Sequence, residues 1–145
     1  MPFQFPLAAV LLVREEAEKR EERALQKIQA EITRILLQVE QLTADIANTH
    51  IAREQAMQKT IPAIELHSYL FKVQACADAK KVLLQTLQAL ELDHDRQLKV
   101  YHAAHRDHET IIEMFNDQRE AYEQKQARSE QKDLDDIFGA RRHRS

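Results

Sequence analysis

Residues 25–46 read LQKIQAEITRILLQVEQLTADI, and the apolar residues of this stretch recur at alternating spacings of three and four. Because an α-helix repeats every 3.6 residues, this spacing gathers them into a narrow stripe along one side of a helix. Such a stripe is typical of a coiled-coil seam, so the helix needs a partner. The stripe consists of Leu25, Ile28, Ile32, Ile35, Val39, Leu42 and Ile46.

The partner helix is expected downstream in the same chain, where the same rhythm resumes at Leu66 and continues, with polar interruptions, to Tyr122. Between the two series stands Pro62, which has no amide hydrogen and disfavours helical geometry in the residue before it. We therefore predict an all-α fold, a long antiparallel two-helix coiled-coil hairpin whose second helix is longer than the first. The second stripe begins in the register Leu66, Leu70, Val73, Ala77, Lys80, Leu84, Leu87 and Glu91.

The predicted organisation is a single coiled-coil domain over residues 1–145. One glycine in 145 residues leaves little material for the tight turns of a sheet, which agrees with long helices. The oligomeric state stays open, because the same stripe that closes a hairpin can close an intermolecular bundle. The predicted segments are a first helix over 6–58, a turn over 59–62, a second helix over 63–138 and a basic tail over 139–145.

Folding back at residues 60 and 61 places residue i opposite residue 121 minus i. The apolar stretch 25–46 then faces 73–98, and the charged stretch 14–23 faces 98–108. At 1.5 Å per residue the second helix overhangs the first by about 35 Å. A second apolar contact is expected between Leu7, Val10 and Leu11 on one helix and Ile111, Ile112 and Phe115 on the other.

The charged stretch of this register contains histidines opposite glutamates. These side chains are interpreted as solvated on a leaky seam, because exposed pairs contribute little. The alternative hypothesis is that Glu18 or Glu21 pairs with protonated His105 or His108 and tightens this end as the pH falls through the histidine range. His102, His105 and His108 follow one another at intervals of three. They turn through about 300° around a helix and cannot converge on one ion, so no metal site is expected.

Other site chemistry is absent from the sequence. A net charge of -3 gives no basic field for nucleic acid, and no glycine-rich phosphate loop or nucleophile with a recognisable base is present. We therefore expect no enzyme activity, no cofactor and no nucleic-acid partner. The single Cys76 is interpreted as a small buried hydrophobic residue in a reducing compartment. The apolar opening 1–13 lacks a basic start and a cleavage site and is too short to span a bilayer, so we expect a cytoplasmic protein.

The end of the second helix combines apolar residues with charge. Leu134, Ile137 and Phe138 lie on the predicted overhang, where no residue of the first helix covers them, which indicates either a docking surface or self-association. Gly139 is predicted to end the helix, and basic residues suit the negative end of the helix dipole. The basic residues after it are Arg141, Arg142, His143 and Arg144.

Two segments resemble a known family. The opening FQFPLAAVLLVRE, residues 3–15, and the ending ARSEQKDLDD, residues 127–136, are similar to the corresponding parts of the FliJ family of flagellar export proteins. The total length and the two-helix plan agree, so the resemblance covers nearly the whole chain. It implies an antiparallel coiled coil similar to the central stalk of rotary ATPases, located in the cytoplasm and held at the inner membrane through the export apparatus, and a role in motility and chemotaxis.

The same resemblance implies partners. FliJ-family proteins are understood to insert into the hexameric export ATPase, to contact the membrane-embedded export gate and to assist the escort of export chaperones. By analogy, the end of the chain that would enter the ATPase carries its partner-binding residues. They are Phe3, Phe5, Leu7, Leu134, Ile137, Phe138, Arg141, Arg142 and Arg144.

Three alternatives remain open on the sequence alone. The first is the equivalent stalk protein of a virulence-type III secretion system. The second is a cytoplasmic holdase chaperone that grips unfolded proteins between its helices. The third is a structural coiled coil that dimerises through the overhang and has no specific partner.

Overall fold

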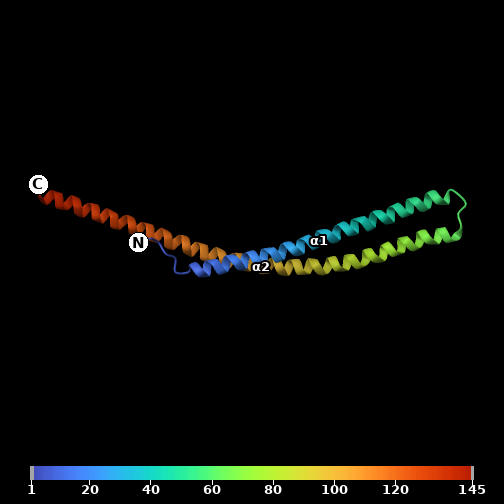
Figure 1. Cartoon of the computed structure of the whole chain (residues 1–145), viewed down its shortest axis with the longest axis horizontal. Coiled ribbons are helices and arrows are strands. Elements are labelled where there is room, and N and C mark those ends of the chain that lie inside the picture. Colours follow the sequence, from blue (N-terminus) through green and yellow to red (C-terminus); the bar gives the residue numbers. More distant parts are fainter. Residues whose placement is uncertain (1, 145) are drawn as a thin grey trace. The chain divides into compact units, whose positions relative to one another are not determined.

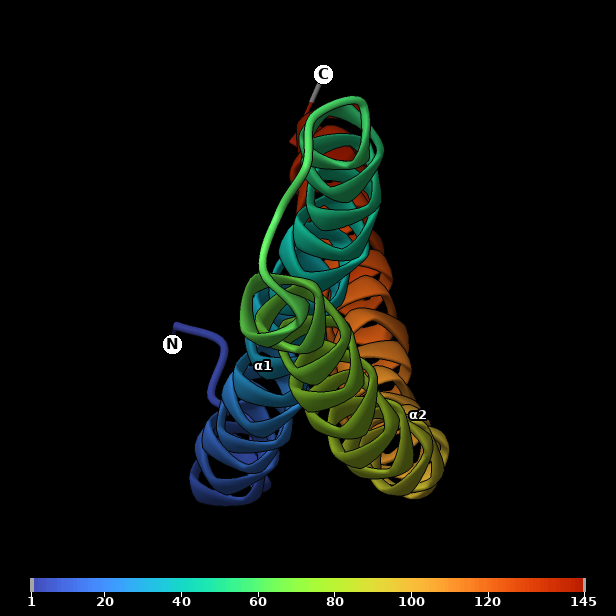
Figure 2. The ribbon, with the colours of Figure 1, turned by 90° about the vertical axis from the view of Figure 1, so that its right-hand side faces the viewer.

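The computed structural model describes residues 2–144 and contains two α-helices, with no strand among the described residues (Figure 1). The first, α1, spans Ala8–Met57, and the second, α2, spans Ala63–Arg144. With 50 and 82 residues, the second helix is the longer, as the sequence predicted. Figure 2 shows the short connection between them, which joins the end of α1 to the start of α2. The all-helical hairpin prediction is confirmed.

The start of α1 is set by a turn at Pro6. Pro6 was predicted to begin the helix, but Pro6 and Leu7 form a turn and the helix begins at Ala8. The carbonyl of Phe5 accepts a hydrogen bond from the amide of Ala8 at 3.1 Å, and the carbonyl of Leu7 accepts one from Leu11 at 2.9 Å. The residues before the turn therefore lie outside the helix.

The start of α2 follows from Pro62. Its carbonyl accepts hydrogen bonds from the amides of Glu65 at 3.1 Å and Leu66 at 3.4 Å, which close the first helical turn. Proline suits this position because the amide that it lacks has no helical partner there. Glu65 adds a carboxylate to the positive end of the helix dipole. The sequence therefore places the break between the helices at the correct residue.

The end of α2 differs from the prediction. The helix was expected to stop at Phe138, yet it continues through Gly139 to Arg144. A glycine ends a helix by adopting a left-handed conformation, and no glycine or other described residue has a positive φ. The residues after it, alanine and arginines, favour helix. The segment predicted as a tail is therefore helical.

Replacing Gly139 by alanine is expected to stabilise the end of α2 by about 0.5–1 kcal/mol, because glycine costs more backbone entropy in a helix. A Cβ built at this position meets no atom within 4 Å, so no clash opposes the gain. Slower amide hydrogen exchange over residues 134–143 would show the effect. Ala140→Gly, one residue further, serves as the opposite control and is expected to speed exchange. Faster exchange in the Gly139→Ala variant would contradict a helical Gly139.

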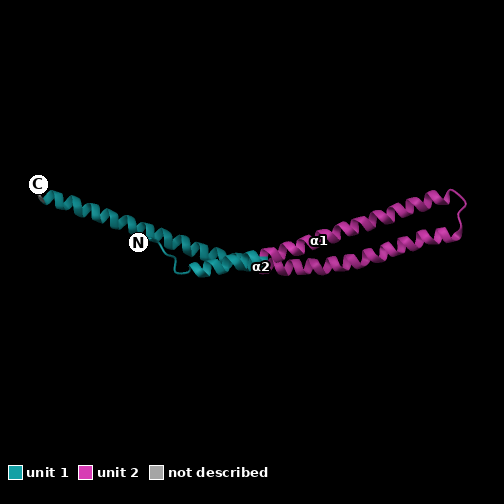
Figure 3. Ribbon diagram, viewed as in Figure 1, with its two compact units in different colours: residues 1–21, 101–145 teal, residues 22–100 magenta. Residues whose placement is uncertain are grey.

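The chain divides into two compact units (Figure 3). Unit 2 comprises residues 22–100 and unit 1 comprises residues 1–21 and 101–145. In unit 2, α1 and α2 run antiparallel on either side of the turn, and Ile35 at the centre is only 1% exposed. Leu25, Thr49 and Leu87 are also buried there. The Thr49 hydroxyl is satisfied because it donates to the carbonyl of Asp45 at 2.7 Å. The prediction of a single domain remains untested.

The register within each unit lies close to the predicted one. In unit 2 the predicted rule pairs Gln29 with Leu92, and the structure has the Gln29 amide nitrogen 3.3 Å from the His94 ring. In unit 1 Glu18 lies beside His105 and His108. Both pairs are displaced in the same direction, by a few residues. The apolar stretch 25–46 therefore faces the part of α2 expected from the sequence.

Three of the eight predicted positions in the α2 seam are displaced by one residue. Leu70 and Leu84 were placed on the seam, but they are 45% and 44% exposed, and Glu91 is exposed as well. The residues immediately before them are less exposed and occupy the contact with α1 instead. Positions seven apart, from Leu66 through Val73 to Leu87, are covered as predicted. The less exposed neighbours are Tyr69, Leu83 and Leu90.

Candidate partner-binding surfaces and an ion-pair cluster

Unit 1 contains an aromatic cluster formed by the residues before α1 and one side of α2. The Phe5 ring meets the Phe115 ring edge to face, with centroids 5.2 Å apart and planes at 88°. Phe3 lies 5.7 Å from Phe115 and 5.5 Å from Tyr122. Edge-to-face and tilted contacts are the favourable geometries for such rings. The segment before α1 is therefore held on α2 by three aromatic contacts.

Three of the predicted partner-binding residues, Phe3, Phe5 and Leu7, are partly or fully buried in the structure. Phe5 is only 8% exposed, because Phe115 lies against it. Phe3 and Leu7 are half-buried. The sequence expected Phe115 to contact residues inside the first helix, and the structure shows it against aromatic residues that precede the helix. Phe5 is therefore a packing residue in this conformation, and its role toward a partner stays a prediction.

The C-terminal part of α2 in unit 1 is open to solvent. Every residue from Glu123 to His143 is exposed except Gly139, which is half-buried. The large apolar side chains of this segment, Leu134, Ile137 and Phe138, are 49%, 52% and 59% exposed. This exposure agrees with the predicted overhang.

The continued helix aligns the basic residues with the apolar ones. Ile137 and Phe138 follow Leu134 by three and four residues, so the three side chains lie on one face of α2. Arg141 follows Ile137 by four residues, and Arg142 follows Phe138 by four, so both extend the same face. A disordered tail would not have fixed this relation. The side chain of Arg144 lies outside the part of the chain that the structure describes.

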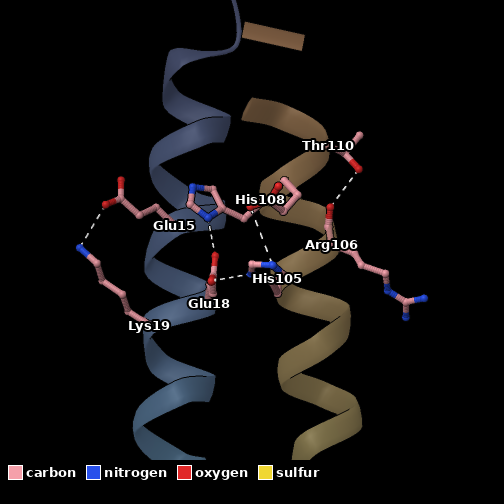
Figure 4. Close-up of polar contacts among 8 residues, drawn as sticks. Glu15, Glu18, Lys19, His105, Arg106, His108 and Thr110 are labelled. Atoms are coloured by element: carbon pink, nitrogen blue, oxygen red, sulfur yellow. Dashed lines mark hydrogen bonds and ion pairs between the residues drawn. The ribbon is translucent and has the colours of Figure 1, made fainter. Parts of the chain in front are cut away.

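Glu18 links the two helical segments of unit 1 through two histidines (Figure 4). Its Oε1 atom lies 2.8 Å from Nδ1 of His105, and its Oε2 atom accepts a hydrogen bond from Nδ1 of His108. The side chains of Glu18 and His108 are 16% and 17% exposed, and that of His105 is 42% exposed. The favoured interpretation of solvated side chains was wrong here, and the alternative hypothesis of a glutamate–histidine contact holds, with Glu18 at its centre.

The contacts shift two pKa values in opposite directions. The hydrogen bond from His105 lowers the pKa of the Glu18 carboxyl below its ordinary 4.5; burial opposes this shift, and the contact with His108 reinforces it. The hydrogen bond to Glu18 raises the pKa of His105 above its ordinary 6.5. Both shifts favour the ionised pair, in which a carboxylate faces an imidazolium.

Weaker contacts surround this cluster. The guanidinium of Arg14 lies 3.5 Å from the carboxylate of Asp107, with both side chains about half exposed. Exposed pairs of this kind contribute little to stability. The ring of Tyr101 stacks on that of His105 with centroids 6.0 Å apart, which limits the orientations available to the imidazole. Glu18 and His108 are less exposed than the side chains of this surrounding pair.

The described residues hold no group of three His, Cys, Asp or Glu side chains arranged to bind a metal ion. Cys76 is a free thiol, half-buried in unit 2. Over residues 2–144, neither helix includes an apolar segment long enough to cross a bilayer.

An apolar surface near the turn of unit 2 was missed by the sequence analysis. Ile64 and Phe71 are 77% and 78% exposed and line a shallow depression on α2 together with His67 and Leu70. Ile64 and Phe71 are seven residues apart and share one face of the helix. The sequence could have indicated this surface, because Ile64 and Phe71 are large apolar residues that fall outside the predicted seam.

A model of one protein family, described as "Flagellar FliJ protein", matches residues 3–145. The match spans almost the entire chain, including both units and both ends. No curated protein and no solved structure gave a match to the chain.

Proposed function

Since the chain belongs to the FliJ family of flagellar proteins, we propose that it serves flagellar protein export as a stalk-like coiled coil that engages the export ATPase hexamer and the export gate. FliJ-family proteins are export components rather than enzymes, and the proposal assigns no catalytic residue to this chain. The observation that carries the proposal is the uncovered C-terminal segment of α2, residues 123–143, with apolar and basic side chains on one face.

The chemistry of this face suits a protein partner. Leu134, Ile137 and Phe138 are about half exposed, so a partner gains apolar burial by covering them. Large apolar side chains at the centre of an interface, ringed by polar groups, commonly dominate the binding energy. Arg141 and Arg142 extend the face with donors that suit acidic residues of a partner. The proposed contact is an apolar centre with a basic end.

The predicted N-terminal partner residues have different roles in this proposal. Phe3 and Leu7 are half-buried and belong to the same unit as the exposed segment, so they retain surface for a partner. Phe5 is buried and supports α2 from the side of Phe115. We propose a cytoplasmic location, with attachment to the inner membrane through the export apparatus and with export chaperones as further partners.

The test is titration of the purified protein into the flagellar export ATPase of its own organism, following ATP hydrolysis and ring formation. The native chain is expected to stimulate both. The double variant Leu134→Ala, Phe138→Ala is expected to weaken the apparent affinity roughly 30- to 1,000-fold, because truncation of each of the two interface anchors costs about 1–2 kcal/mol.

The matched control carries Val82→Ala and Leu92→Ala, which remove two similarly exposed apolar side chains of α2 within unit 2. This control is expected to stimulate as the native chain does. Equal loss in both double variants would place the contact elsewhere. Absence of binding by a native chain confirmed to be helical would reject the stalk role.

Three other roles remain as alternatives. A stalk protein of a virulence-type III secretion system would stimulate the ATPase of that system instead. A holdase chaperone would suppress aggregation of unrelated proteins with no ATPase present. A structural coiled coil that dimerises through residues 123–143 would show a mass that rises with concentration and would bind no specific partner.

A further inference from the structure

We propose that Glu18, His105 and His108 form a proton-operated clamp, which holds the first turns of α1 against α2 within unit 1 more tightly when an imidazole of the pair is protonated. The proposal concerns a regulatory contact inside this chain and is independent of the proposed export function. The ligand that operates it is a proton.

The geometry of the clamp is one carboxylate between two imidazoles. An ionised carboxylate has only acceptor sites, so each Nδ1 atom facing Glu18 must carry a hydrogen. His105 lies 2.8 Å from one carboxylate oxygen, and His108 is hydrogen-bonded to the other. Neutral imidazoles can make both bonds, but a protonated one makes a charge-assisted bond that is stronger. The contact is therefore present at neutral pH and tightens when a proton is added.

The charge balance favours the uptake of one proton. A single carboxylate with only 16% of its side chain exposed is poorly hydrated, and the first imidazolium neutralises it. The carboxylate carries a single negative charge, so it balances one imidazolium group. Glu109 lies 3.8 Å from the far nitrogen of His105 and adds a second, weaker negative charge on that side.

Several other charged groups near the clamp have ion-pair partners of their own. On α1, Glu15 pairs with Lys19 at 3.1 Å, as Figure 4 shows, and Glu21 pairs with Arg20 at 3.4 Å. Across the helices, Arg14 pairs with Asp107. The segment 2–7 carries no titratable side chain. The remaining titratable side chains near the histidines on α2 are Tyr101, which stacks on His105, His102, whose ring meets Tyr101, and Arg106.

The direction of the pH effect follows from the two pKa shifts. The pKa of His105 is raised in the folded protein, so its stabilisation is fully present below its ordinary 6.5 and is lost as the pH rises through the higher folded value. The pKa of Glu18 is lowered, so its stabilisation is present above its ordinary 4.5 and is lost as the pH falls below that value. The clamp is therefore tightest between pH 4.5 and 6.5 and loosens toward pH 8.

The clamp controls how often the residues before α1 cover the aromatic rings of Phe115 and Tyr122 on α2. The residues that precede α1 place Phe3 and Phe5 on Phe115 and Tyr122. Glu18 lies on α1, which directly follows these residues, and the two histidines lie on α2, which carries Phe115 and Tyr122. Loosening the clamp therefore lowers the barrier to separating the N-terminal segment from α2. Mild acid is expected to keep this aromatic surface covered, and alkaline conditions are expected to uncover it more often.

The experiment is amide hydrogen exchange of the full chain at pH 6 and pH 8, corrected for intrinsic exchange rates and followed over residues 8–21. Protection in the native chain is expected to be roughly two- to fivefold higher at pH 6, a range suited to a partly solvated charge pair. The variants E18Q and H105Q/H108Q are expected to lose this difference. His50→Gln, which changes an exposed histidine of unit 2, is expected to behave as the native chain.

Equal native protection at the two pH values would overturn the proposal, as would a difference that persists in E18Q or in the double histidine variant. A second measurement needs no variant. Nuclear magnetic resonance titration of the His105 imidazole in the native chain is expected to give a pKa above its ordinary 6.5, and a value at or below 6.5 would overturn the clamp.

Discussion

The Ile35→Ala variant is expected to lose about 2–4 kcal/mol of unfolding free energy, the largest effect of any single aliphatic truncation in this chain. Ile35 is 1% exposed and is the most completely buried large side chain among the described residues. Removal of its three outer carbons leaves a cavity between two helices that have no further layer to collapse into it. Denaturant unfolding followed by helicity measures the loss.

Leu36→Ala is the matched control for this substitution. Leu36 is the next residue of α1, and its side chain is 49% exposed. Its truncation is expected to change the unfolding free energy by less than about 1 kcal/mol, because little buried area is lost and alanine favours helix. Equal losses at positions 35 and 36 would show that the seam does not pass through Ile35.

The Phe115→Ala variant is expected to open unit 1 locally. The ring of Phe115 contacts both Phe3 and Phe5, so its removal leaves the segment before α1 without its main support. Because Phe115 is half-buried, the expected cost is about 2 kcal/mol, below that of a fully buried phenylalanine, and it corresponds to roughly thirtyfold faster amide exchange over residues 8–21.

Met114→Ala provides the comparison for Phe115→Ala. Met114 is adjacent on α2 and 38% exposed, and it lies outside the aromatic cluster. This variant is expected to exchange within about twofold of the native chain. Unchanged exchange in Phe115→Ala would show that the aromatic contacts do not hold the N-terminal segment, and Phe3 and Phe5 would then be available to a partner.

The Ile35→Ala and Phe115→Ala predictions test two different kinds of side-chain packing. Unit 2 is held by aliphatic side chains in a seam, with Leu25, Ile35 and Leu87 buried. Unit 1 is held by aromatic rings and by a carboxylate between two histidines. Aliphatic burial depends little on pH, whereas the ionic contact of unit 1 titrates. Regions with few buried apolar contacts open at lower free energy, so unit 1 is expected to respond first to a change in conditions.

The helices themselves were predictable because their signals are local. The three-and-four spacing over residues 25–46 reports a helical face directly, and Pro62 marks the break through its missing amide. The nearness of Glu18 to the histidines followed from the register, because folding back at residues 60 and 61 places residues 14–23 opposite residues 98–108; the hydrogen bonds between them were only an alternative hypothesis. Gly139 misled the prediction because glycine permits a left-handed stop without requiring one.

The rotation of α2 was not predictable because apolar residues occur there in adjacent pairs. Tyr69 stands beside Leu70, and Leu83 stands beside Leu84, so both steps of three and steps of four give an apolar stripe. The structure chooses the first member of each pair for the contact with α1. One residue corresponds to about 100° around a helix, so this choice moves the second member onto the surface.

The sequence by itself determined that this chain is two helices with a break at Pro62, that they pair antiparallel, and that the α2 face with Leu134 and Phe138 lies beyond the end of α1. The spacing of apolar residues, the missing amide of proline and the lengths of the segments are local features, so they can be read from the sequence without knowledge of tertiary contacts. Only the tertiary structure decided which side of α2 meets α1, that Phe5 is covered by Phe115, and that Glu18 serves both histidines. These outcomes depend on how side chains from distant parts of the chain fit together, and packing of that kind has no local signature.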